Sequence, residues 1–321
     1  MKKLFIAVLV PALAGIALLL YLNSAPPGMR ESAFTVSYGD SMRRIAGNLK
    51  KSGLIRSGDF FVYSSYIADR RHVRAGTYRI FAGMNSLEIL RKLTRGDILS
   101  RKVTIPEGFN LYQIAERLEA NRVCDYNAFL DHAFDETFLK TLGVDSPTAE
   151  GYLFPDTYVF PEGSDPRDII GIIQKKMMTV LGDRPAYGPG MTAREILTMA
   201  SLVEKEAKVY NEREFISSVF HNRLRKNMRL DCDPTVRYAV RKFTGPITVS
   251  DLRSDSPYNT YRRTGLPPTP ICSPGRESIL AAMYPMKSDY LYFVAKNDGS
   301  HHFSRTLKEH NEAVRKYQRG K

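Results

Sequence analysis

The sequence predicts an α+β fold in which an apolar N-terminal helix precedes a small α+β region and then a larger α+β domain. Three observations lead to this prediction. Residues 4–22 carry no charge, short alternating strands precede amphipathic helices between residues 34 and 148, and helices alternate with Pro-rich polar loops over residues 149–321. With 321 residues, 43% of them hydrophobic, the chain is long enough for two or three packed domains.

The uncharged run over residues 4–22 is a predicted transmembrane anchor. As a helix it would cover about 28 Å, which matches the hydrocarbon core of a bilayer. Lys2 and Lys3 precede it, so residues 1–3 are expected to form a cytoplasmic stub and the rest to lie outside the bacterial inner membrane. A cleavable signal peptide is the alternative, but its apolar core is usually shorter and Pro26-Pro27 makes a poor cleavage site.

The charge balance gives no reliable sign of a nucleic-acid partner. Lys and Arg exceed Asp and Glu by 47 to 34, a net charge of +13, which would ordinarily raise nucleic acid as a partner. An exported chain does not meet chromosomal DNA, so we expect this charge to face anionic lipid head groups or an acidic wall polymer. Three cysteines allow at most one internal disulfide, and Cys232 with Cys272 is one possible pair. The sequence has no C-x-x-C motif, so a structural zinc site is not expected.

A weak internal repeat follows a short linker over residues 23–33. Residues 34–41 form a strand and a Gly turn before a helix at 42–51, and residues 102–109 do the same before a helix at 110–120. This strand, turn and helix unit resembles half of a LysM module, a small peptidoglycan-binding fold, although such units are also common in unrelated proteins. We therefore assign residues 34–148 to a LysM-like α+β region. A further strand at 76–80 and a helix at 86–94 lie between the repeats.

The domain over residues 149–321 contains the candidate catalytic helix. Helices are predicted over residues 129–142 and 166–181, and Thr192 with Glu195 forms a capping box that begins a helix running to about Lys208. On that helix Glu204 lies about 60° from the centre of the apolar stripe, with Glu206 on the other flank. A carboxylic acid at the edge of a buried face is partly withdrawn from water, as a general acid near neutral pH must be.

The loops after this helix favour a glycan substrate. They expose amides, hydroxyls and aromatic rings, while Pro residues fix their backbone, and this combination suits an uncharged polymer rich in hydroxyl groups. Ordinary turn composition explains any one of these stretches but not all of them together. The stretches cover residues 218–224, 228–238, 256–261 and 265–271.

Several motifs in one order resemble the endolytic murein transglycosylase family, MltG or YceG-like. The resemblance implies cleavage of the MurNAc–GlcNAc β-1,4 bond of nascent peptidoglycan strands without hydrolysis, leaving 1,6-anhydro-MurNAc ends. By position in the motif the catalytic residue is Glu204, with Glu206 as the alternative. The motifs are residues 150–158, 200–207, 222–224, 233–236, 256–261, 265–268, 290–294, 302–304 and 310–311.

The same resemblance suggests residues that hold the substrate and the partners of the protein. Asp233, Tyr258, Asn259 and Tyr261 are the candidates for holding the sugar, and Glu150 for positioning it or supporting the groove. No cofactor or metal is expected. The implied partners are peptidoglycan glycan strands, the inner membrane and peptidoglycan synthases, with no nucleic acid.

Two further predictions depend on this region. His301, His302 and His310 raise the question of a metal site, but adjacent residues of a strand point to opposite faces, so only one of the first two could join His310 as a ligand. A polar network at the groove is the favoured role of these histidines. The competing function is a membrane-anchored scaffold without catalysis, which binds peptidoglycan through the LysM-like region. The products formed from purified glycan strands would discriminate between the two functions.

Overall fold

The computed structural model describes residues 2–37, 39–70, 72–182, 190–296 and 298–318, without the side chains of residues 2–8 and 210. The chain divides into two compact units. Unit 1 comprises Met1–Arg101 with Val159–Ser164, and unit 2 comprises Lys102–Tyr158 with Asp165–Lys321. This division differs from the predicted boundary at residues 148 and 149. The reason is that the helices after residue 110 pack with the C-terminal helices, as α6 (Tyr126–Ala133) does against α8 (Pro166–Leu181).

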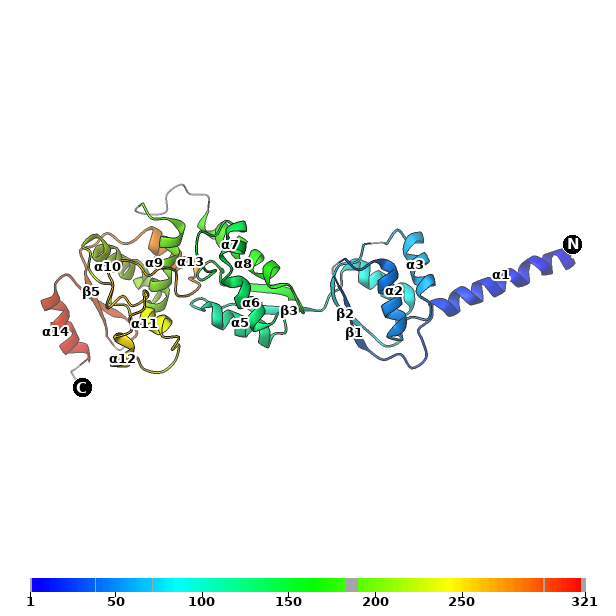
Figure 1. Ribbon diagram of the computed structural model, residues 1–321, viewed down its shortest axis with the longest axis horizontal. Helices are drawn as coiled ribbons and strands as arrows, with labels where there is room; N and C mark the ends of the chain where they lie inside the picture. The colour runs from blue at the N-terminus through cyan, green and yellow to red at the C-terminus, as the bar shows by residue number, and fades with distance from the viewer. Residues whose placement is uncertain (1, 38, 71, 183–189, 297, 319–321) are drawn as a thin grey trace. The chain divides into compact units, whose positions relative to one another are not determined.

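Unit 1 is built from two strands with two helices between them (Figure 1). Strands β1 (Ser32–Val36) and β2 (Gly76–Ile80) pair antiparallel, with Phe34 opposite Tyr78. Helices α2 (Met42–Lys51) and α3 (Gly58–Ile67) connect them, and α4 (Ser86–Arg95) follows. The apolar side chains of α2 at Ile45 and Leu49 enter the core, as their helical spacing predicts. The predicted strand at 76–80 and helix at 86–94 are confirmed.

The N-terminal helix α1 (Lys2–Asn23) forms over the predicted apolar run. Its C-terminal end is held within unit 1 by polar contacts. The Asn23 side chain accepts a hydrogen bond from the Leu87 amide at 3.0 Å, and the Arg56 guanidinium lies 4.4 Å from the centre of the Tyr21 ring. Nowhere in the described residues is a helix both long and apolar enough to cross a bilayer. The transmembrane role predicted for residues 4–22 is therefore not supported.

The first part of unit 2 contains three short helices before α8. These are α5 (Leu111–Ala120), α6 and α7 (Glu136–Thr141). The single helix predicted over residues 129–142 is wrong, because α6 ends at Ala133 and Asp135 caps the next helix by accepting a hydrogen bond from the Phe138 amide at 3.0 Å. The helix predicted over residues 166–181 is confirmed as α8.

The predicted internal repeat is present only at the level of local structure. Its second strand is β3 (Ser100–Thr104), which pairs with β4 (Thr157–Pro161) and not with β1 or β2. Helix α5 follows it in unit 2, whereas α2 belongs to unit 1. The two copies therefore do not combine into one module.

The second part of unit 2 is organised around α9 (Ala193–Glu206). Thr192 caps α9 and forms the predicted capping box with Glu195. Helices α10 (Arg213–Arg225) and α13 (Arg276–Met283) pack against α9 and against each other (Figure 1). Around them lie the 3-10 helix η1 (Tyr210–Glu212), α11 (Asp233–Ala239), α12 (Val249–Leu252), the antiparallel strands β5 (Tyr292–Ala295) and β6 (His301–Ser304), and α14 (Leu307–Gln318).

Candidate active site

Three consecutive side chains at the end of α9 contact three different parts of unit 2. Glu204 meets the start of α13, Lys205 meets Gly108, and Glu206 meets Cys232 just before α11. Successive residues of a helix point about 100° apart, which explains this divergence. The two candidate acids therefore occupy different environments although one residue separates them.

Glu204 is held tightly by groups from two neighbouring helices. Its Oε2 accepts hydrogen bonds from the Gly275 amide at 3.0 Å and from the Ser278 hydroxyl at 2.7 Å. Its Oε1 lies 3.9 Å from the Arg213 guanidinium, which also donates to the Ser278 hydroxyl. Only 8% of the Glu204 side chain is exposed. These contacts join α9, α10 and α13, so the Glu204 carboxylate acts as a brace between helices.

A second carboxyl group that the sequence did not single out lies beside this brace. A Cβ built on Gly275 would come 2.1 Å from Oε1 of Glu107, so the absence of a side chain at Gly275 makes room for the Glu107 carboxyl group. Partial burial, and then the charge of Glu204, raise the pKa of Glu107. Glu107 thus belongs to the brace, and no pattern in the sequence indicated it.

Glu206 faces a pocket of about 610 Å³. Its Oε1 accepts a hydrogen bond from the Cys232 thiol at 3.3 Å, and a thiol is a weak donor. Burial raises the pKa of Glu206 and the nearby Asp233 carboxylate adds to the effect, while the Cys232 thiol lowers it. A carboxyl group whose pKa is raised in this way holds its proton to higher pH than a solvated one, and the open space beside it lets the proton reach a ligand.

The pocket collects residues from most of the sequence motifs. Glu206 comes from α9, Arg223 from α10, Asp233 from the start of α11, and Tyr261 from the loop after α12. The C-terminal strands and α14 complete the wall. Their contributions are Tyr292, Phe293, Val294, Ala295, His301, Leu307, His310, Val314 and Gln318.

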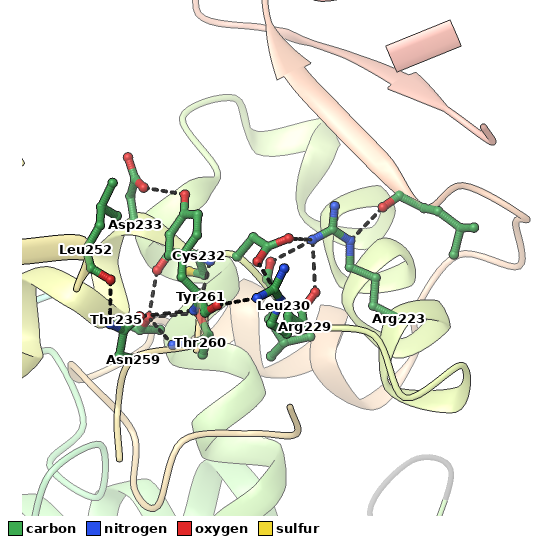
Figure 2. A network of polar contacts seen from close by, with 12 residues as sticks. Arg223, Arg229, Leu230, Cys232, Asp233, Thr235, Leu252, Asn259, Thr260 and Tyr261 are labelled. Atoms are coloured by element: carbon green, nitrogen blue, oxygen red, sulfur yellow. Dashed lines mark hydrogen bonds and ion pairs between the residues drawn. The ribbon is translucent and has the colours of Figure 1, made fainter. Parts of the chain in front are cut away.

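Asp233 and Tyr261 form one side of the pocket. The Tyr261 hydroxyl donates to Oδ1 of Asp233 at 2.6 Å, as Figure 2 shows. The second oxygen of Asp233 remains available as an acceptor for a sugar hydroxyl or amide. Two of the predicted substrate-binding residues therefore lie in the pocket together with Glu206.

Arg223 fixes the opposite side of the pocket (Figure 2). Its Nε donates to the Leu291 carbonyl at 2.7 Å, and its Nη1 donates to the Leu230 carbonyl at 2.9 Å and to the Asp231 carboxylate at 3.2 Å. The guanidinium also lies 5.2 Å from the centre of the Tyr292 ring. One buried cation thus ties α10 to the segments on both sides of the pocket, a role that the sequence did not reveal.

The histidines follow the predicted alternation. His301 and His310 line the pocket, whereas the His302 ring lies 5.8 Å from that of Tyr317. His301 is clamped by Glu212, whose carboxylate lies 2.6 Å from Nδ1 and accepts from the backbone amide at 2.8 Å. Burial and the charge of Arg223 lower the pKa of His310. The described residues contain no group of three or more potential metal ligands.

Tyr258 and Asn259 lie outside the pocket lining. The Asn259 side chain is fully buried and donates to the carbonyls of Leu252 and Ser254 at 2.9 and 2.7 Å. The Tyr258 hydroxyl lies 2.8 Å from the Thr269 hydroxyl. Both side chains therefore hold the loop that carries Tyr261. Their direct contact with the substrate stays a prediction, because neither residue lines the pocket.

Glu150 is also buried away from this pocket. Its Oε2 accepts hydrogen bonds from the Leu111 amide at 3.1 Å and from the Tyr238 hydroxyl at 3.0 Å, while Oε1 has no partner in the described part of the chain. Burial raises the pKa of Glu150 to about 8. Glu150 therefore links α5 with α11, and its predicted role in positioning the substrate or supporting the groove stays a prediction.

The cysteines are free in the structure. Cys232 and Cys272 are both buried. The Cys232 thiol donates a hydrogen bond to Glu206, and the Cys272 thiol lies 3.5 Å from the Ser201 carbonyl. The possible pair between them is not formed.

Comparison with known proteins agrees with this convergence of motifs. The YceG-like family model matches residues 34–316. The chain belongs to the YceG-like family. An endolytic murein transglycosylase of Bacillus subtilis strain 168 is 38% identical over 316 residues, covering 91% of this chain and 87% of the relative. The corresponding enzyme of Streptococcus pneumoniae strain D39 is 31% identical, and the match covers 86% of this chain and 56% of that relative.

A solved structure of another YceG-like protein has a similar fold. The crystal structure of a putative yceG-like protein from Listeria monocytogenes aligns with a TM-score of 0.59 at 34% identity. The alignment covers 88% of this chain and 99% of the crystal structure. The family therefore accounts for both units and not only for the region around α9.

Proposed function

We propose that the protein is an endolytic lytic transglycosylase that cleaves the MurNAc–GlcNAc β-1,4 bond of peptidoglycan strands and leaves 1,6-anhydro-MurNAc ends. Curated relatives at 30 to 38% identity carry the name endolytic murein transglycosylase. One observation carries the proposal most directly. Residues from several separate motifs meet around a carboxyl group, Glu206, that is withdrawn from water yet borders an open pocket.

We assign the general acid to Glu206 and not to Glu204, the residue preferred from the sequence. A general acid needs a carboxyl group that can hold a proton and reach the substrate. Glu206 borders the pocket and, among the described residues, receives only a thiol hydrogen bond, whereas Glu204 accepts from an amide and a hydroxyl and lies near a guanidinium. The geometry supports Glu206 because Glu204 is already used to hold three helices together.

In the proposed reaction one carboxyl group performs both proton transfers. Protonated Glu206 donates its proton to the glycosidic oxygen as the bond to C1 of MurNAc breaks, which releases the GlcNAc end as an alcohol. The resulting Glu206 carboxylate then removes the proton from the C6 hydroxyl, whose oxygen bonds to C1. The nucleophile belongs to the reacting sugar, so no activated water is needed.

Asp233 and Tyr261 are the best placed residues to hold the sugar. Their mutual hydrogen bond at 2.6 Å presents a fixed acceptor and an aromatic ring to the pocket. Aromatic rings pack against sugar faces, and carboxylates accept hydrogen bonds from hydroxyl and amide groups. This pair would orient the N-acetyl and hydroxyl groups while Glu206 acts on the glycosidic bond.

Unit 1 is proposed to contribute wall binding. The predicted LysM-like region covers residues 34–148, and the order strand, helix, helix, strand with antiparallel pairing of β1 and β2 supports this interpretation for its N-terminal part. Sedimentation of the full chain with insoluble peptidoglycan would test this role, with retention lost when surface residues of α2 and α3 are changed. The extracytoplasmic location follows from the wall substrate, while association with the inner membrane and with synthases stays a prediction.

Product analysis tests the proposed reaction. The purified protein is incubated with peptidoglycan glycan strands, and the new chain ends are identified by mass spectrometry. The wild type is expected to cut within long strands and so to create new anhydro-MurNAc ends, whereas Glu206→Gln should create none. Products with reducing MurNAc ends have a mass greater by one water molecule than those with anhydro ends. Their formation would show hydrolysis and contradict the mechanism. No cleavage by the wild type would favour the scaffold function.

A further inference from the structure

A second pocket in unit 2 lies directly behind the wall that carries Glu206. It encloses about 250 Å³ and is lined by Asn110 and Gln113 of α5, Lys205 of α9, and Arg237 and Tyr238 of α11, together with Phe243, Pro234 and Ile271. We call it the basic pocket. Lys205 precedes Glu206 and Pro234 follows Asp233 in the chain, so the same turns of α9 and α11 border both pockets.

The basic pocket holds two cations that are not neutralised. Lys205 is exposed and donates to the Gly108 carbonyl at 3.2 Å, and Arg237 donates to the Gly245 carbonyl at 2.6 Å. Both acceptors are uncharged, and in the described part of the chain neither cation pairs with a carboxylate. An ammonium has three donors and a guanidinium five, so most of their donors remain for a ligand.

The buried carboxyl group of Glu150 does not cancel this charge at neutral pH. Glu150 bonds to the Tyr238 hydroxyl behind the pocket and is fully buried. Because burial raises the pKa of Glu150 to about 8, this group is mostly protonated at pH 7. No Asp or Glu is among the residues described as lining the pocket. The pocket is therefore an electropositive site suited to an anion.

Aromatic and amide side chains give the pocket further selectivity. The rings of Tyr238 and Phe243 lie 6.5 Å apart and form an apolar side. Asn110 and Gln113 supply amide groups on the α5 side, although both also take part in the capping box of α5. This combination of cations, an apolar side and amide groups fits a short acidic peptide better than a simple inorganic anion.

We propose that the basic pocket binds the carboxylates of the peptide stem attached to the MurNAc residue whose glycosidic bond is cleaved, so that the enzyme prefers strands that keep their stems. This inference rests on the proposed function, because the glycan in the Glu206 pocket delivers the stem. A stem begins on the lactyl group of MurNAc and is therefore present at high local concentration beside the sugar site. Lys205 and Arg237 would each form a charge-assisted hydrogen bond to it.

The test compares cleavage of two substrates by the full chain. One is glycan strands with intact peptide stems, and the other is the same strands after an amidase has removed the stems. Lys205→Gln and Arg237→Gln are each expected to lower kcat/KM on stem-bearing strands about tenfold or more. Both variants should leave the rate on denuded strands unchanged. Lys226→Gln, which removes an exposed cation after α10, serves as the matched control and should change neither rate.

The outcomes separate this inference from the proposed function. Suppose that the wild type forms anhydro ends. If the two variants then lose activity equally on both substrates, or lose activity on neither substrate, the peptide-binding role is wrong and the transglycosylase proposal stands. If the wild type cleaves neither substrate, the proposed function itself fails. Melting temperatures of the variants should match the wild type, since the hydrogen bonds of both cations within the described residues go to loop carbonyls. A supporting binding arm uses Glu206→Gln with a soluble stem-bearing disaccharide, whose affinity should fall when Lys205→Gln is added.

Discussion

The two sides of the last turn of α9 use the same side chain for opposite purposes. On one side Glu204 is 8% exposed and accepts hydrogen bonds from the Gly275 amide and the Ser278 hydroxyl. On the other side Glu206 receives a single thiol hydrogen bond and borders a pocket of about 610 Å³. A carboxylate surrounded by donors stabilises the packing of helices, whereas one with few donors in a desolvated pocket is suited to proton transfer.

Removal of the brace should lower stability more than removal of the acid. Glu204→Ala is expected to reduce the free energy of unfolding by about 2 to 4 kcal/mol, because it breaks two charge-assisted hydrogen bonds and removes a carboxylate that lies 3.9 Å from the Arg213 guanidinium. Glu206→Ala should change it by less than about 1 kcal/mol, since a poorly solvated carboxyl group is lost with only a thiol contact. Urea denaturation measures both. Equal losses of unfolding free energy in the two variants would contradict the distinction between a bracing Glu204 and a weakly held Glu206.

The buried Glu150 gives the fold a pH dependence of known sign. The pKa of Glu150 is raised from 4.5 to about 8 in the folded chain, so the unfolded chain releases this proton at lower pH than the folded chain does. The stabilisation that protonated Glu150 adds to the free energy of unfolding is therefore fully present below about pH 4.5 and is lost as the pH rises toward 8. The free energy of unfolding falls by at most about 1.4 kcal/mol per pH unit from this cause.

A Glu150→Gln variant tests this effect. The stability of the wild type should fall relative to that of the variant between pH 5 and pH 8, because Gln cannot ionise. Unfolding measured across this range gives the difference directly. Parallel curves for the two proteins would show that Glu150 titrates normally and is not the buried neutral acid described here.

The smallest expected effect concerns the charge beside the acid. The Asp233 carboxylate helps to raise the pKa of Glu206, so Asp233→Asn should lower that pKa and move the alkaline limb of the activity profile to lower pH. The profile of kcat/KM against pH measures the shift. Asp231→Asn is the matched control, because Asp231 lines the same pocket but pairs with Arg223. A shift of equal size in both variants would show that Asp233 has no special relation to Glu206.

The sequence predicted local structure well where the cause was local. The capping box of Thr192 and Glu195, the strand at 76–80 and the helix at 166–181 depend on neighbouring residues and were confirmed. The helix predicted over 129–142 is wrong because Asp135 caps a new helix within that range. The unit boundary could not be predicted, since it depends on the pairing of β3 with β4 and on packing between helices distant in sequence.

The candidate site shows the same limit. Of the residues that the sequence offers as candidates, Glu206, Asp233 and Tyr261 line one pocket in the structure. The choice between Glu204 and Glu206 depends on what covers each flank of α9. A helical projection shows which residues border the apolar stripe and not which loops pack against it. The roles of Arg223, Glu107 and Gly275 likewise arise from contacts between distant segments.

The central claim is that Glu206, and not Glu204, performs the proton transfers. The most direct test is the rate of anhydro-MurNAc formation by purified Glu204→Gln and Glu206→Gln on one preparation of stem-bearing glycan strands. Loss of a general acid lowers the rate by about a hundredfold to ten-thousandfold, and we predict this loss for Glu206→Gln alone, with Glu204→Gln within about tenfold of the wild type. Activity retained by Glu206→Gln and abolished in a folded Glu204→Gln would contradict the assignment.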